Sequence, residues 1–100
     1  MSYGYAKRRV DDNQNSIVKS LRFIPGISIA LTHIIGDGFP DMIIGYNGIN
    51  YLIELKDGNK PPSQRKLTPD EIKWHENWKG QVNVCKNLGE ILKLIGINVK

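Results

Sequence analysis

Cysteine is nearly absent from this chain of 100 residues, in which Cys85 is the only one. An intramolecular disulfide is therefore excluded, and a zinc site built from several cysteines is strongly disfavoured. A single cysteine suits a reducing compartment, so we expect the protein in the cytoplasm. Hydrophobic residues make up 40% of the chain and charged residues 24%, which is typical of a globular protein and not of a disordered one.

Long apolar runs are also absent. Lys7, Arg8 and Arg9 are followed by Asp11 and Asp12, where a secretion signal would need an apolar stretch. No other segment approaches the apolar length that spans a bilayer. We therefore expect no membrane partner, and we expect no nucleotide cofactor either.

The charge balance is basic, because 14 Lys and Arg outweigh 10 Asp and Glu and leave a net charge of +4. This excess favours an anionic partner, with nucleic acid first among the candidates. At 100 residues the chain has room for one domain with a core of moderate size. We therefore expect a single domain over residues 1–100.

Apolar spacing and turn signals predict an α/β domain with a mixed sheet flanked by helices, in the order αβββαβα. The first helix is expected from Val10 onward, with Asp11 or Asp12 as its cap, and Pro25 with Gly26 ends it. Further helices are predicted at 68–79, after a capping box that begins at Thr68, and at 88–95. Strands are predicted at 27–32, 41–46, 49–56 and 81–85.

The second strand is apolar at successive positions in Met42-Ile43-Ile44. Continuous apolar strands are typical of sheets that are covered on both faces. We therefore predict three layers, with helices on either side of the sheet.

Asn47-Gly48 is the strongest hairpin signal in the chain. With a two-residue loop, Asp41 lies opposite Glu54 on the neighbouring strand, and Lys56 shares the face of Glu54 because side chains alternate along a strand. A four-residue loop would keep all three on one face, whereas a three-residue loop would not.

Two carboxylates at such cross-strand positions repel each other by about 3 kcal/mol at a separation of about 5 Å and an effective dielectric of about 20. Lys56 offsets part of this repulsion, and a hard divalent cation can offset more. Carboxylates, a metal and a lysine are what hydrolysis of a phosphodiester requires. The alternative interpretation is a salt-bridge cluster without a catalytic role.

The ordered residues resemble a known family. Gly38-Phe39-Pro40-Asp41, then Glu54-Leu55-Lys56, a basic loop and a helix are similar to the PD-(D/E)XK nucleases, whose core is restriction-endonuclease-like. More narrowly, the chain resembles the small stand-alone phage-type members of the virus-type replication-repair nuclease (VRR-NUC) group, over roughly Val10 to Leu94.

The resemblance implies Mg²⁺- or Mn²⁺-dependent hydrolysis of DNA. Asp41, Glu54 and the main-chain carbonyl of Leu55 match the metal-ligand positions of the family, and Lys56 matches its catalytic lysine. Small members of the group are similar in fold to resolvases of four-way (Holliday) junctions and are expected to act as homodimers.

The first helix departs from the family pattern, because many members carry a glutamate where this chain has Asn13 and Gln14. Gln14 precedes Ile17 and Val18 by a helical turn and therefore projects toward the sheet. It can orient water or supply a neutral oxygen ligand, so it joins the candidate catalytic residues. A glutamine that is only hydrogen-bonded under the sheet is the alternative.

Basic and polar residues of two segments flank the proposed site and are candidates for contacts with DNA phosphates. They are Arg8, Arg9, Lys60, Gln64, Arg65 and Lys66. We assign no catalytic role to His33 or His75. Trp74 and Trp78, one helical turn apart, are interpreted as core or dimer contacts.

These observations predict a structure-specific endodeoxyribonuclease that cuts branched DNA as a homodimer. The rival hypothesis is a nucleic-acid-binding or interaction module of the same fold with weak or no catalysis, because the acid of the first helix is missing.

Overall fold

The computed structural model describes residues 13–98. Its four-stranded mixed sheet has the order β1-β2-β3-β4 and is flanked by helices, which confirms the predicted fold class. Two short 3-10 helices, η2 and η3, are additions to the predicted order. The elements are α1 (Gln14–Arg22), β1 (Ser28–Leu31), η2 (His33–Ile35), β2 (Met42–Tyr46), β3 (Ile49–Leu55), η3 (Pro62–Gln64), α2 (Pro69–Asn77), β4 (Asn83–Cys85) and α3 (Leu88–Ile95).

Helix α1 has Asn13 as its N-cap, and the Asn13 side chain makes no capping hydrogen bond to the described residues. The expected caps, Asp11 and Asp12, and the expected first residue, Val10, lie outside the described residues. The apolar stripe is as the sequence predicts, because Ile17, Val18 and Leu21 are all buried.

The β2–β3 hairpin has the predicted register, with Tyr46 paired to Ile49 and Met42 to Ile53. Asn47 and Gly48 both have positive φ, of 53° and 78°, as the tight two-residue turn requires. The ladder ends one pair earlier than expected, since Asp41 lies just before β2. Its amide still donates to the carbonyl of Ile53 at 3.0 Å.

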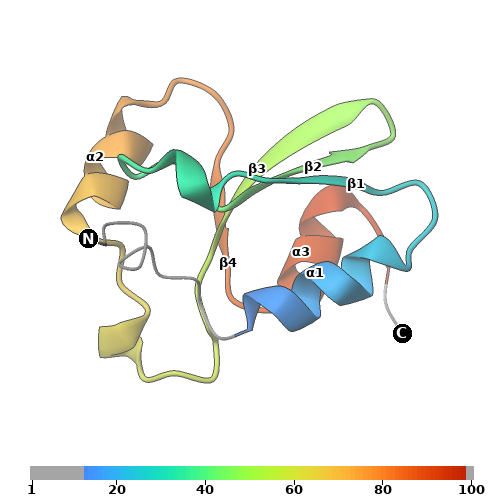
Figure 1. The fold of residues 1–100 in the computed structure, drawn as a ribbon, viewed down its shortest axis with the longest axis horizontal. Coiled ribbons are helices and arrows are strands. Elements are labelled where there is room, and N and C mark those ends of the chain that lie inside the picture. Colours follow the sequence, from blue (N-terminus) through green and yellow to red (C-terminus); the bar gives the residue numbers. More distant parts are fainter. Residues whose placement is uncertain (1–12, 99–100) are drawn as a thin grey trace, which may run out of the picture.

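The hydrophobic core lies between one face of the sheet and two helices, α1 and α3, which Figure 1 shows on the same side of the strands. Alternate residues of β2 and β3 supply the sheet side of this core. Its fully buried members include Leu21, Met42, Ile44, Ile53 and Ile91.

The prediction of helices covering both faces is wrong for most of the second face. Helix α2 lies over only one end of it, where β2 begins and β3 ends (Figure 1). Farther along this face Ala30 is exposed, Ile43 and Leu52 are half-buried, and Val84 is 42% exposed. The apolar run of β2 therefore does not reflect two complete helical layers.

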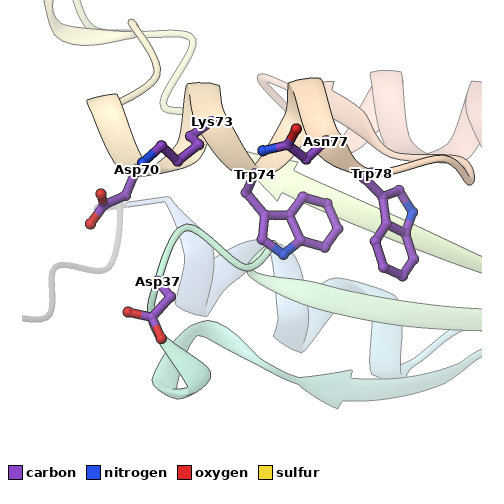
Figure 2. Close-up of a pocket in the computed structure, with 6 residues that line it drawn as sticks. All are labelled: Asp37, Asp70, Lys73, Trp74, Asn77 and Trp78. Atoms are coloured by element: carbon purple, nitrogen blue, oxygen red, sulfur yellow. The ribbon is translucent and has the colours of Figure 1, made fainter.

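Helix α2 begins with the predicted capping box of Thr68 and Glu71. It ends at Asn77, earlier than predicted, because Trp78 adopts an extended conformation and its indole N–H donates to the carbonyl of Gln81 at 3.2 Å. The rings of Trp74 and Trp78 stack with centroids 4.6 Å apart (Figure 2). Neither tryptophan belongs to the hydrophobic core, and Trp78 is 43% exposed, so the core interpretation of this pair is wrong.

Among residues 13–98, no helix combines the length and the apolar character needed to cross a membrane.

Candidate active site

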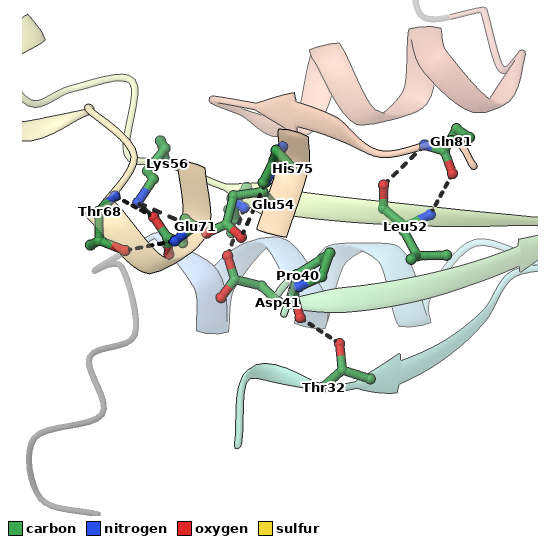
Figure 3. A network of polar contacts seen from close by, with 11 residues as sticks. Thr32, Pro40, Asp41, Leu52, Glu54, Lys56, Thr68, Glu71, His75 and Gln81 are labelled. Carbon is green, nitrogen blue, oxygen red and sulfur yellow. Dashed lines mark hydrogen bonds and ion pairs between the residues drawn. The ribbon is translucent and has the colours of Figure 1, made fainter. Parts of the chain in front are cut away.

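Asp41, Glu54 and Lys56 meet where β2 begins and β3 ends, as the hairpin register predicts (Figure 3). The Asp41 carboxylate accepts a hydrogen bond from the amide of Leu55 at 2.7 Å. The Asp41 side chain thus replaces a main-chain carbonyl as the hydrogen-bond partner of β3 at this point. This bond to β3 fixes the position of the carboxylate. Glu54 is 1% exposed and Lys56 is 8% exposed, with 3.8 Å between Glu54 Oε2 and Lys56 Nζ.

A third carboxylate reaches this cluster from α2. Glu71 Oε1 accepts hydrogen bonds from the Lys56 ammonium and from the amide of Thr68, both at 2.9 Å. The sequence marks Glu71 as half of a capping box, and that local role hides its contact with Lys56. No sequence signal shows which strand residue the start of α2 will face.

His75 follows Glu71 by one helical turn and also faces the cluster, with Nε2 4.0 Å from Glu54 Oε1. Burial lowers its pKa, which favours the neutral ring at pH 7. From the sequence, His75 is expected to be structural. Its spacing from Glu71 is the one available signal, because residues at i and i+4 share a helix face.

Burial and neighbouring charge set the protonation of the carboxyl groups. Burial is the main cause that raises the pKa of Glu54 to about 10, and the negative charges of Asp41 and Glu71 add to its effect. Burial likewise raises the pKa of Asp41. For Glu71, burial is outweighed by the hydrogen bonds from Thr68 and Lys56, and the pKa falls. At neutral pH the Glu54 carboxyl therefore keeps its proton and shares a hydrogen bond with Asp41.

The cluster has more acidic groups than Lys56 alone can balance. Lys56 contacts both Glu71 and Glu54, whereas Glu54 Oε1 is buried and has no hydrogen-bond partner in the described part of the chain. Oxygen donors of this kind suit a hard divalent cation, and Asp41, Glu54 and the carbonyl of Leu55 would supply them. The described residues hold no preformed group of three or more His, Cys, Asp or Glu side chains arranged for a metal ion.

Gln14 is 2% exposed, and its side-chain amide contacts Nδ1 of His33 at 3.3 Å. Its carbonyl oxygen is buried and has no hydrogen-bond partner within residues 13–98. Among residues 13–98 the structure does not include Gln14 in the hydrogen-bond network of Asp41, Glu54 and Lys56. The two networks are joined through the backbone, because the amide of Thr32, next to His33, donates to the carbonyl of Asp41 at 2.8 Å.

The loop between Lys56 and α2 carries the predicted phosphate-contacting residues of this part of the chain. Gln64 and Lys66 are exposed, and Lys60 and Arg65 are half-buried. Arg65 Nε has no hydrogen-bond partner among the described residues. Arg8 and Arg9, the other candidates, lie outside the described residues.

Scans of the chain against protein-family models, curated proteins and solved structures returned no match.

Proposed function

We propose that the protein is a metal-dependent endodeoxyribonuclease. The observation that supports this most directly is the meeting of Asp41, Glu54 and Lys56 at the ends of two paired strands. Their buried cluster includes a carboxyl oxygen of Glu54 that has no hydrogen-bond partner among residues 13–98. The net charge of +4 suits a nucleic-acid substrate. The resemblance to the PD-(D/E)XK nucleases leads to the same activity.

Asp41, Glu54 and the carbonyl of Leu55 would hold Mg²⁺ or Mn²⁺. When bound, such an ion polarises a phosphoryl oxygen and lowers the pKa of its water. Glu54 must release its proton to become a ligand, and its hydrogen bond to Asp41 is then replaced. Lys56 Nζ, held at 2.9 Å by Glu71, would orient the attacking water and offset charge that develops on the phosphate.

Lys60, Gln64, Arg65 and Lys66 lie on the loop that leads from Lys56 to α2. They would bind phosphates on either side of the scissile bond, since such contacts position nucleic acid without reading its sequence. The proposed substrate is branched DNA such as a four-way junction, the proposed active form is a homodimer, and the proposed location is the cytoplasm. These three assignments follow from the family resemblance and from the single cysteine.

A DNA-binding or interaction module with weak catalysis is the second candidate. It is favoured by the neutral Gln14, whose amide contacts His33, and by the lack of a preformed three-ligand metal group among the described residues.

A cleavage assay separates the two candidates. Purified protein is incubated with a four-way junction, a flap and a linear duplex, each with Mg²⁺, Mn²⁺ or EDTA. We expect cleavage of the branched substrates with metal only, and loss of cleavage in Asp41→Asn, Glu54→Gln and Lys56→Ala.

Glu76→Gln is the matched control, because Glu76 is an exposed acid on the same helix as Glu71. Binding without cleavage by the unmodified protein would favour the binding module. Cleavage that survives Lys56→Ala would remove Lys56 from the mechanism.

A further inference from the structure

A cavity of about 360 Å³ lies beside the carboxylate cluster, between α2 and the loop that leads into β2. Six residues line it, most of them on α2. They are Asp37, Asp70, Lys73, Trp74, Asn77 and Trp78. Figure 2 shows the two indole rings side by side, Trp74 on α2 and Trp78 directly after its end, with Asp37 on the loop across from the helix.

The aromatic wall of this cavity is held in place although Trp78 is 43% exposed. Its ring stacks on Trp74 with an interplanar angle of 19°, and its indole N–H is fixed by the carbonyl of Gln81. Phe39 makes a T-shaped contact with Trp74, with ring centroids 5.2 Å apart. The stacked pair is thus pre-organised, and a planar ring can stack on a face of Trp78 that Trp74 does not cover, without ordering a mobile side chain.

The loop wall is fixed against α2 by a close backbone contact. Gly38 has a φ of +82°, and a Cβ at this position would lie 2.3 Å from the carbonyl oxygen of Asp70. Only glycine allows the loop to approach this closely. Asp37 on the loop and Asp70 on the helix are thereby held on facing sides of the cavity.

The cavity and the candidate active site are built on the same two segments, which are α2 and the loop that leads into β2. On α2, Asp70 and Trp74 line the cavity, and the next residues along the chain, Glu71 and His75, face the cluster. A group bound in the cavity therefore lies against the face of α2 that adjoins the face in contact with Lys56.

We propose that this cavity binds an unpaired nucleobase of the DNA substrate. Stacking on tryptophan suits any base, because every base has a π face. Asn77 and Lys73 can donate hydrogen bonds to ring nitrogens and carbonyl oxygens, and Asp37 and Asp70 can accept them from amino and imino groups. The two carboxylates repel phosphate, so the base enters and the backbone stays outside.

This inference rests on the proposed nuclease function and narrows its substrate class. Bases within an intact duplex are stacked on their neighbours and cannot reach Trp78. The cavity therefore selects DNA with at least one unpaired nucleotide close to the cleaved phosphate, as at a flap or at a branch point where a base pair has opened.

Tryptophan fluorescence tests the inference directly, because the only two tryptophans of the chain both line the cavity. Unmodified protein in EDTA is titrated with a single-stranded deoxyoligonucleotide and with a blunt duplex of the same sequence. We expect the single strand to quench the fluorescence and the duplex to leave it nearly unchanged. Equal quenching by both would overturn the proposal.

Affinity for the same oligonucleotide, labelled and followed by anisotropy, is then compared among variants. Trp78→Ala should weaken binding of the single strand by about tenfold, and Asn77→Ala should weaken it severalfold. Glu76→Ala, on the same helix but outside the cavity, should bind like the unmodified protein. If Trp78→Ala fails to fold, Asn77→Ala decides, and unchanged affinity in that variant would overturn the proposal.

The absence of metal separates this test from the test of the proposed function. Quenching without any cleavage activity would retain the base-binding cavity and remove the nuclease assignment. Cleavage without quenching would retain the nuclease assignment and overturn the base-binding cavity.

Discussion

Glu54 should make the metal-free protein less stable as the pH rises. Its pKa is about 10 in the folded protein, against an ordinary value of 4.5. Between these two values the folded state holds a proton that the unfolded chain releases. The stability present below pH 4.5 is therefore lost progressively as the pH approaches 10.

The size of the effect follows from linkage. One extra proton in the folded state lowers the free energy of unfolding by about 1.4 kcal/mol for each pH unit. From pH 7 to pH 9 the loss is about 3 kcal/mol, a large part of the 5–15 kcal/mol by which a typical domain is stable. His75 does not contribute to this loss between pH 7 and pH 9. Its pKa lies below the ordinary value of 6.5, so its effect on the free energy of unfolding falls at lower pH, where it makes stability rise with pH.

Glu54→Gln should abolish this slope, because glutamine keeps the shape of the protonated carboxyl and does not titrate. The measurement is urea unfolding in EDTA at several pH values, followed by circular dichroism. At pH 4 the variant and the unmodified protein should be about equally stable, and at pH 9 the variant should be clearly more stable. Glu76→Gln, an exposed acid, should follow the unmodified protein at every pH.

Parallel stability curves for the unmodified protein and Glu54→Gln between pH 7 and pH 9 would refute the reasoning. They would mean that Glu54 ionises in the folded state without cost and that the cluster has no need of a further cation. Saturating Mg²⁺ should remove most of the slope in the unmodified protein, because the bound cation takes the place of the proton.

Three further predictions concern metal, DNA and assembly. Mg²⁺ or Mn²⁺ should raise the melting temperature by mass action, and Asp41→Asn should lose this rise. Ca²⁺ should bind without supporting cleavage. Calorimetry that detects no metal binding at concentrations supporting cleavage would contradict ligation by Asp41. Replacing Lys60, Arg65 and Lys66 together by Ala should flatten the salt dependence of DNA binding, by about 0.9 in the log–log slope for each phosphate that the loop no longer neutralises; an unchanged slope would place the DNA path elsewhere. Light scattering at micromolar concentration should report about twice 11.3 kDa, and a monomer that still makes paired nicks in a junction would disprove the homodimer.

Local signals account for the parts of the fold that the sequence predicts well. Asn47-Gly48 sets the hairpin and its register because the turn needs two residues with positive φ. The last helix has the predicted bounds, since Asn87 caps its start and Gly96, with a φ of 95°, ends it. Both features depend only on neighbouring residues, and the register alone brings Asp41 toward Glu54.

The other half of the candidate site depends on how α2 packs, which local signals do not determine. Glu71 and His75 face the cluster because α2 covers one end of the open sheet face, and this placement depends on the contact between Gly38 and Asp70. The glycine is visible in the sequence, but its partner lies 32 residues away, and nothing local links the two. For the same reason the helical spacing of Trp74 and Trp78 does not show that their rings lie outside the core.

Glu71 connects the folding of α2 with the geometry of the candidate site. Its Oε1 accepts hydrogen bonds from the amide of Thr68 and from Lys56, so one half of the capping box and one contact of the lysine share a single oxygen atom. A helix cap contributes about 1 kcal/mol, and a hydrogen bond between charged groups adds a comparable amount. The contact between Lys56 and Glu71 therefore forms only when α2 is formed and packed against the sheet. Because α2 also carries Trp74 and is followed directly by Trp78, the contact of the lysine with Glu71 and the proposed base-binding surface become ordered together.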